Sequence, residues 1–108
     1  MNTRQRTKIA ELQDVLVAVG LRTVPQQADV LCLSRSTTWS IMRSSPKSGG
    51  LTATTINRIL AAPQLPPVAR QKVLEYAREK AAGLYGHNRT QLRRFIVQLP
   101  TEALGGIG

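Results

Sequence analysis

One stretch of the chain, residues 33–44 with the sequence LSRSTTWSIMRS, carries arginine, hydroxyl and tryptophan side chains and no carboxylate. On an α-helix, which turns by about 100° per residue, Thr38, Ile41 and Met42 gather on one side. The other side presents cationic, hydroxyl and aromatic groups, namely Arg35, Ser36, Trp39, Ser40 and Arg43. Arginine can form paired hydrogen bonds with guanine or bind phosphate, and hydroxyls bond to bases or phosphates. Because an ordinary exposed helix face mixes both signs of charge, this acid-free face indicates a polyanionic partner.

The chain as a whole is basic, with 15 Lys and Arg residues, six Asp and Glu residues and a formal net charge of +9. Nucleic acid is the commonest partner of such a protein, although ribosomal and membrane-surface proteins share the excess of positive charge. No apolar segment is long enough for a signal peptide or a membrane span. The sequence therefore predicts a cytoplasmic protein that does not engage a membrane.

Residues suited to catalysis or metal binding are few. His87 is the only histidine and Cys32 the only cysteine, which excludes a disulfide within the chain and a cysteine-rich zinc site. No carboxylate stands near His87 in the sequence YGHNR, and we interpret this histidine as a loop or cap residue. We expect Cys32 to be a small buried hydrophobe. Since a phosphate-binding loop is also missing from the sequence, we predict no enzyme, no cofactor and no metal site.

Apolar residues recur at helical spacing between glycine- and proline-rich breaks, and no segment alternates with period two. The sequence therefore predicts an all-α fold, a compact bundle of about five to six helices that includes a helix-turn-helix. One helical domain would span residues 8–100. Residues 1–7 are expected to be a flexible basic arm, whose cations either attract DNA or are merely solvated, and residues 101–108 a flexible tail.

Apolar stripes mark several of these helices. The stripe of the first helix, which stops at Gly20, comprises Ile9, Leu12, Leu16 and Val19. Thr52 begins a later helix whose inward residues are Ile56, Ile59 and Leu60. Two further helices within residues 67–99 carry the stripes Val73, Ala77, Ala81 and Leu84, and Leu92, Phe95, Ile96 and Leu99. This C-terminal pair either completes the core or forms a homodimer contact. Its arginines, Arg89, Arg93 and Arg94, are a second basic patch or a solvated face.

Local signals divide residues 23–44 into two short helices. Thr23 can cap the first of them, and Gln26 three residues later completes a capping box. Ala28 is small enough to let two helices approach closely. Ser34 caps the second helix, predicted at about residues 35–44.

The segment TVPQQADVLCLSRSTTWSIM resembles the helix-turn-helix of lac-repressor-like and lambda-repressor-like regulators. The positions that match the motif are Ala28, Cys32, Leu33, Ser34, Thr37 and Ile41. The segment LTATTINRILAA looks like the helix that follows the motif in lac-repressor-like headpieces, so that the resemblance covers about residues 22–62.

Two departures from the family pattern concern the turn and the second helix. Cys32 stands where the family usually has a glycine in a left-handed conformation, which predicts a strained or differently shaped turn. Thr38 and Trp39 replace the usual apolar and small polar pair. Trp39 would therefore contact DNA or pack against the later helices.

The resemblance implies a set of DNA contacts. The residues that match base-reading positions are Arg35, Ser36, Trp39 and Ser40. The residues expected at the DNA backbone are Gln26, Gln27, Ser34, Thr37, Arg43, Lys47 and Ser48. The chain is too short to add a ligand-binding domain of the kind found in these repressors, and no small-molecule effector is evident.

The hypothesis from sequence is a small DNA-binding transcriptional regulator, a repressor or accessory factor that acts by occupying its operator. The alternative is a helical protein-interaction module of the antiactivator type that keeps the helix-turn-helix shape. Exposure of Trp39 and Met42 as one apolar patch would favour this alternative. RNA binding is disfavoured, because four aromatic residues offer no stacking platform.

Overall fold

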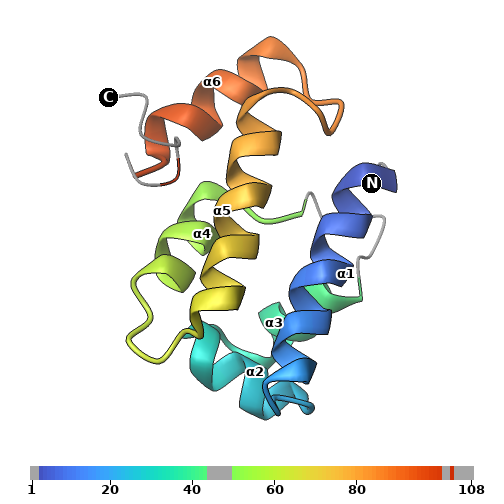
Figure 1. The fold of residues 1–108 in the computed structure, drawn as a ribbon. Helices are drawn as coiled ribbons and strands as arrows, with labels where there is room; N and C mark the ends of the chain where they lie inside the picture. Colours follow the sequence, from blue (N-terminus) through green and yellow to red (C-terminus); the bar gives the residue numbers. More distant parts are fainter. Residues whose placement is uncertain (1–2, 44–49, 101–102, 104–108) are drawn as a thin grey trace.

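The computed structural model describes residues 3–43, 50–100 and 103, and in these residues it contains six α-helices and no strand (Figure 1). The helices are α1 (Thr3–Ala18), α2 (Val24–Leu31), α3 (Arg35–Met42), α4 (Ala53–Leu60), α5 (Pro67–Ala81) and α6 (Arg89–Gln98). The predicted all-α bundle is confirmed. Every helix of the described residues is too short or too polar to cross a bilayer.

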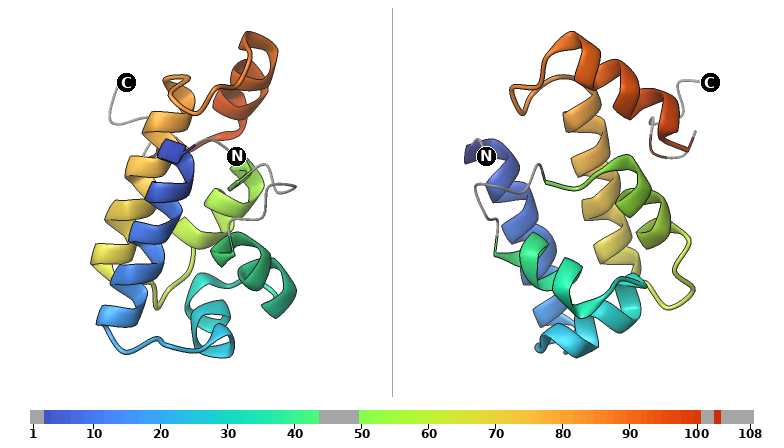
Figure 2. Two further views of the ribbon diagram at one scale, coloured as in Figure 1. Left: turned by 90° about the vertical axis from the view of Figure 1, so that its right-hand side faces the viewer. Right: turned by 180° about the vertical axis from the view of Figure 1, so that it is seen from behind.

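The long helices α1 and α5 lie side by side, and α5 also contacts α4 and α6 (Figures 1 and 2). The short helices α2 and α3 lie at one end, and α6 lies at the other (Figure 1). Fully buried aliphatic side chains from several helices and their connections fill the core, including Leu16, Leu31, Leu51, Ile59 and Val73. Burial of each stabilises the fold by about 1.5–3 kcal/mol.

A buried clamp of hydrogen bonds holds the backbone of Leu51, just before α4. The Tyr76 hydroxyl accepts a hydrogen bond from the Leu51 N–H at 2.9 Å and donates one to Gln5 Oε1 at 3.1 Å. Lys80 Nζ donates to the Leu51 carbonyl at 2.7 Å, and burial lowers the pKa of this lysine to about 8. The preceding Gly50 has φ +78°, and a Cβ there would collide with the Tyr76 hydroxyl. This position therefore requires glycine.

Ion pairs connect α1 to α5. Lys8 Nζ lies 3.1 Å from Glu75 Oε1 and 3.3 Å from Glu79 Oε2, and Lys72 Nζ lies 3.0 Å from Glu11 Oε1. The hydrogen bond from Lys72 holds the pKa of Glu11 below its usual value. Burial raises the pKa of Glu79, but hydrogen bonds from α1 outweigh it and the net shift is downward.

The prediction of a flexible arm over residues 1–7 is wrong for residues 3–7, which form the first turns of α1. Arg4 Nε lies 2.7 Å from Glu79 Oε1. Gln5 is only 3% exposed, and its amide oxygen accepts from Tyr76. One cation of this segment, Arg4, thus pairs with a carboxylate of α5. Residues 1 and 2 lie outside the described part of the chain.

Two predicted core residues are exposed, because each lies just past the end of its helix. Val19 follows the last residue of α1, and Leu84 follows the last turn of α5; they are 48% and 45% exposed. The predicted tail, residues 101–108, lies outside the described residues except for Ala103, which is buried.

Candidate nucleic-acid interface

The capping box predicted at the start of α2 is present. The Gln26 N–H donates to Thr23 Oγ1 at 3.3 Å, and Gln26 Oε1 accepts from the Thr23 N–H at 3.1 Å. Gln26 Oε1 also accepts from the Arg22 N–H at 2.9 Å. The side chain of Gln26 is exposed, while the N–H groups of Thr23 and Gln26 are already paired in the capping box and Pro25 has none.

Between α2 and α3 the chain turns over three residues, 32–34. Cys32 adopts φ 57° and ψ 40°, and it is the only residue other than glycine with positive φ in the described ranges. The left-handed conformation therefore falls where the family pattern has glycine, although the residue here carries a side chain. Cys32 is exposed, so the prediction of a buried cysteine is wrong. The Leu33 N–H closes the turn on the Ala28 carbonyl at 3.1 Å.

Ser34 caps α3 as predicted. Its Oγ accepts from the Thr37 N–H at 3.1 Å and donates to Thr37 Oγ1 at 2.8 Å. Both hydroxyls lie at the N-terminal end of α3, beside the first N–H groups of the helix. The positive end of the helix dipole adds to the attraction for an anion.

The inner side of α3 anchors the helix. Thr38 is fully buried, and its Oγ1 donates to the Ser34 carbonyl at 2.9 Å. Ile41 is buried and Met42 half-buried against the core. The predicted division of α3 into an inner and an outer side is confirmed, and the rotation of the helix about its own axis is thereby fixed.

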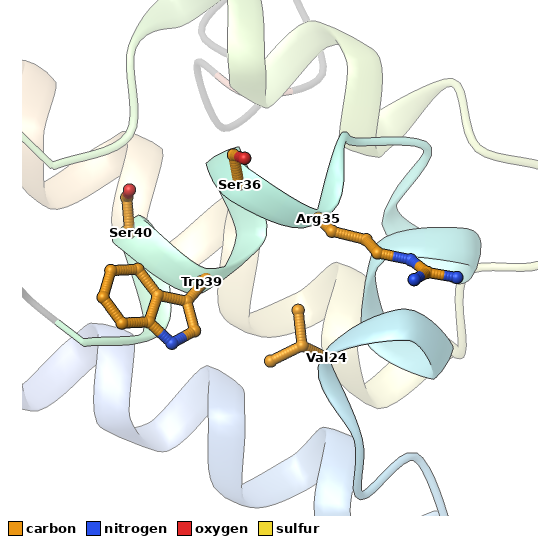
Figure 3. Close-up of a pocket in the computed structure, with 5 residues that line it drawn as sticks. All are labelled: Val24, Arg35, Ser36, Trp39 and Ser40. Atoms are coloured by element: carbon orange, nitrogen blue, oxygen red, sulfur yellow. The ribbon is translucent and has the colours of Figure 1, made fainter.

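The outer side of α3 forms a shallow hollow of about 440 Å³ lined by Val24, Arg35, Ser36, Trp39 and Ser40 (Figure 3). The structure thus brings together all four residues predicted to read bases. In Figure 3 the indole of Trp39 and the methyl groups of Val24 lie on one side of the α3 ribbon, and the hydroxyls of Ser36 and Ser40 on the other. The hollow combines an apolar wall with a polar one.

Trp39 is 50% exposed and is held from one face by Arg43, whose Cζ lies 4.4 Å from the ring centroid. This stacking is worth about 0.5–1 kcal/mol at an exposed site. Half of the indole stays accessible in the hollow, so Trp39 is not buried against the later helices.

The cations of this surface lack acidic partners. Neither Arg35 nor Arg43 forms an ion pair with a carboxylate of the described residues, and α3 itself contains no acid. Their charge is therefore available to a phosphate backbone or a guanine edge.

Of the residues predicted to contact the DNA backbone, one is buried and two lie outside the described part of the chain. Gln27 is only 2% exposed, and its Nε2 donates to the Leu21 carbonyl at 3.0 Å, so its prediction as a phosphate ligand is wrong. The reason is its place on α2, one residue past the exposed Gln26 and turned toward the connection that follows α1. Lys47 and Ser48 lie outside the described residues.

Three residues of this surface were not predicted from the sequence. Val24 completes the apolar wall of the hollow, and Gln13 and Arg22 line a second hollow of about 210 Å³ beside Trp39 and Met42. The place of all three depends on how α1 and α2 pack against α3, which no short-range sequence pattern predicts.

No group of three potential metal ligands occurs among the described residues. His87 lies in the loop between α5 and α6, as predicted for a loop histidine, and its Nδ1 is buried without a hydrogen-bond partner in the described part of the chain. Burial and the nearby Lys80 lower the pKa of His87. These surroundings disfavour the protonated form of the imidazole.

Comparisons with protein-family models, curated proteins and solved structures gave no match. These comparisons therefore give no relative from which a function could be inferred. Support for the interface therefore comes from the exposure, contacts and charges described above.

Proposed function

We propose that the chain is a small cytoplasmic DNA-binding transcriptional regulator of the helix-turn-helix type, which places the outer side of α3 in the major groove. The observation that carries the proposal is the outer side itself: Arg35 and Arg43, without ion pairs among the described residues, beside the exposed hydroxyls of Ser36 and Ser40. The buried Thr38 on the opposite side keeps this set of groups turned outward.

In this arrangement Arg35, Ser36 and Ser40 read base edges, and the exposed part of Trp39 contacts sugars or a thymine methyl. Ser34, Thr37 and Gln26 lie at two helix N-termini and approach the DNA backbone, together with Arg43. Lys47 and Ser48 follow α3 in the chain and are proposed to add backbone contacts.

Regulation would follow from occupancy: a bound copy excludes other proteins from the operator, as a repressor does, or supports their binding as an accessory factor. One α3 spans few base pairs, so two copies per operator are expected. Contact between these copies through the C-terminal helices stays a prediction from the sequence.

A fluorescence-anisotropy titration tests the proposal with a duplex selected from a random pool, an unrelated duplex and a structured RNA over a range of salt. We expect Arg35→Ala to weaken binding to the selected duplex by about 1–3 kcal/mol and to the unrelated duplex much less. The slope of log K against log salt should change by about 0.9 for each phosphate that a variant no longer neutralises. Arg94→Ala is the matched control, because it removes the same charge from α6, which lies at the opposite end of the molecule (Figure 1).

Equal losses on both duplexes would contradict base reading by Arg35. Equal affinity for the structured RNA and the selected duplex would contradict a major-groove mode.

A second candidate function is protein interaction through the same surface. It is favoured by the hollow that Trp39 and Met42 share with Gln13 and Arg22, because an exposed tryptophan beside a methionine is typical of protein interfaces. This candidate predicts no duplex binding at physiological salt.

A further inference from the structure

A second exposed surface lies far from α3, at the opposite end of the bundle (Figures 1 and 2). The end of α5 and the outer side of α6 form a shallow groove of about 270 Å³ there. Its lining combines apolar and cationic side chains: Ala81, Arg89, Leu92, Arg93, Ile96 and Val97. Val97 is 75% exposed, more than any other large hydrophobic residue of the described chain.

The apolar centre of this groove is not required by the core. Phe95 and Leu99 are the residues that α6 and its end bury in the bundle. Leu92 and Ile96 are only half-buried, and Val97 is largely exposed to solvent. An apolar stripe that remains after the core contacts are made costs solubility and indicates a binding surface.

The charged residues that line the groove are both arginines, Arg89 and Arg93. α6 carries Arg89, Arg93 and Arg94 and no acidic residue. None of these arginines forms an ion pair among the described residues. The two carboxylates of α5, Glu75 and Glu79, are taken up by cations of α1. Within the described part of the chain, the rim of the groove is therefore cationic.

We propose that this groove binds an acidic amphipathic helix of another protein. An apolar stripe on the partner helix would pack against Leu92, Ile96 and Val97, and its flanking carboxylates would pair with Arg89 and Arg93. A second copy of the chain fits less well, because two α6 helices would bring their arginines together without a carboxylate between them. A phosphate backbone could pair with the arginines but would leave the apolar centre uncovered. The proposal does not depend on DNA binding by α3.

Three synthetic helical peptides of about 15 residues provide the test. The acidic peptide has leucines at positions i, i+3, i+4 and i+7 flanked by glutamates. The basic peptide replaces each glutamate by lysine, and the polar peptide replaces each leucine by glutamine. Binding of the fluorescently labelled peptides to the full chain is measured by anisotropy at physiological salt. We expect wild type to bind the acidic peptide at least about tenfold more tightly than either of the others.

Variants locate the site. Arg89→Glu combined with Arg93→Glu should weaken the acidic peptide about tenfold or more and strengthen the basic one. Val97→Gln should weaken the acidic peptide without changing any charge, and its exposure makes the substitution safe for folding. Arg94→Glu is the matched control, since it changes the charge of the same helix at a residue outside the groove.

Equal binding of the acidic and basic peptides, or no binding of either, would overturn the proposal. Arg93→Glu alone is compared with Arg94→Glu, and an equal effect of the two would also overturn the proposal, because the peptide would then respond only to net charge. If sedimentation equilibrium shows a dimer that Val97→Gln dissociates, the groove belongs to a second copy. If Arg89→Ala with Arg93→Ala weakens duplex binding as much as Arg35→Ala does, it belongs to nucleic acid. Either result would refute the acidic-helix assignment.

Discussion

The α1–α5 interface and the outer side of α3 use the same residue types in opposite ways. Between α1 and α5, three of the six carboxylates of the chain, Glu11, Glu75 and Glu79, meet Arg4, Lys8 and Lys72. On α3, cations stand beside hydroxyls and the helix carries no carboxylate. The α1–α5 charges are paired within the protein, whereas Arg35 and Arg43 form no ion pair among the described residues.

This contrast separates the charges that are paired within the fold from those that the proposed function assigns to recognition. Exposed ion pairs stabilise a fold by at most about 1 kcal/mol each, so their concentration on one interface mainly fixes how α1 and α5 align. It also takes up three of the six acidic side chains of the chain, whereas α3 carries none and its neighbour α2 carries the exposed Asp29. Substitutions at the α1–α5 interface should therefore change mainly stability, and substitutions on the outer side of α3 should change mainly binding.

The largest loss of stability is expected from Gly50→Ala, at the clamp that joins the α1–α5 pair to α4. The new Cβ would collide with the Tyr76 hydroxyl and approach Gln5 Cδ to 2.9 Å, at a residue with φ +78°. We expect the free energy of unfolding to fall by about 3 kcal/mol, as measured by chemical denaturation. Gly20→Ala is the matched control: its φ is +95° but no atom lies within 4 Å of the added Cβ. Similar losses for both variants would show that the clamp is not tightly packed.

A smaller effect is expected from Glu79→Gln, which removes the carboxylate shared by Arg4 and Lys8. The variant should unfold about 1 kcal/mol more easily near neutral pH and at low salt. Asp14→Asn, at an exposed residue of α1 that forms no ion pair among the described residues, should change stability far less.

The same interface predicts the response to acid. The pKa values of Glu11 and Glu79 are lowered in the folded protein. Their contribution is therefore present above the unfolded value of about 4.3 and is lost as the pH falls through the folded values. Wild type should lose more stability than Glu79→Gln over this range in a series of denaturation curves. Parallel pH profiles would contradict a stabilising role for these pairs.

The smallest effect is expected in the turn before α3. Cys32→Gly removes a Cβ from a residue with φ 57°, and the relief of strain exceeds the added entropy of the unfolded chain. We expect a gain of about 0.5 kcal/mol in thermal or chemical denaturation. Binding to the selected duplex should stay the same, because the turn keeps its conformation. A loss of stability would mean that Cys32 contributes contacts beyond those of the turn.

Much of the local structure could be predicted from short patterns in the sequence. Ser34 and Thr23 are recognisable caps, and helical periodicity alone places Thr38 and Ile41 on the inner side of α3. Such signals act over three or four residues, where the geometry of a helix is known in advance.

Contacts between distant residues were not predictable in the same way. The hydrogen bond between Tyr76 and Gln5 joins residues 71 positions apart, and the pair of Arg4 with Glu79 joins residues 75 apart. A basic N-terminal segment looks like a solvated arm until α5 is known to lie beside it. Gln27 was misassigned for a related reason, since its burial depends on how the end of α1 and its connection fold back onto α2.

An NMR titration of the ¹⁵N-labelled protein with the selected duplex tests the central claim most directly. We expect the largest amide shift changes at residues 34–43 and at the start of α2, with α6 unaffected. Changes confined to α5 and α6, or no changes at physiological salt, would contradict DNA recognition by the outer side of α3.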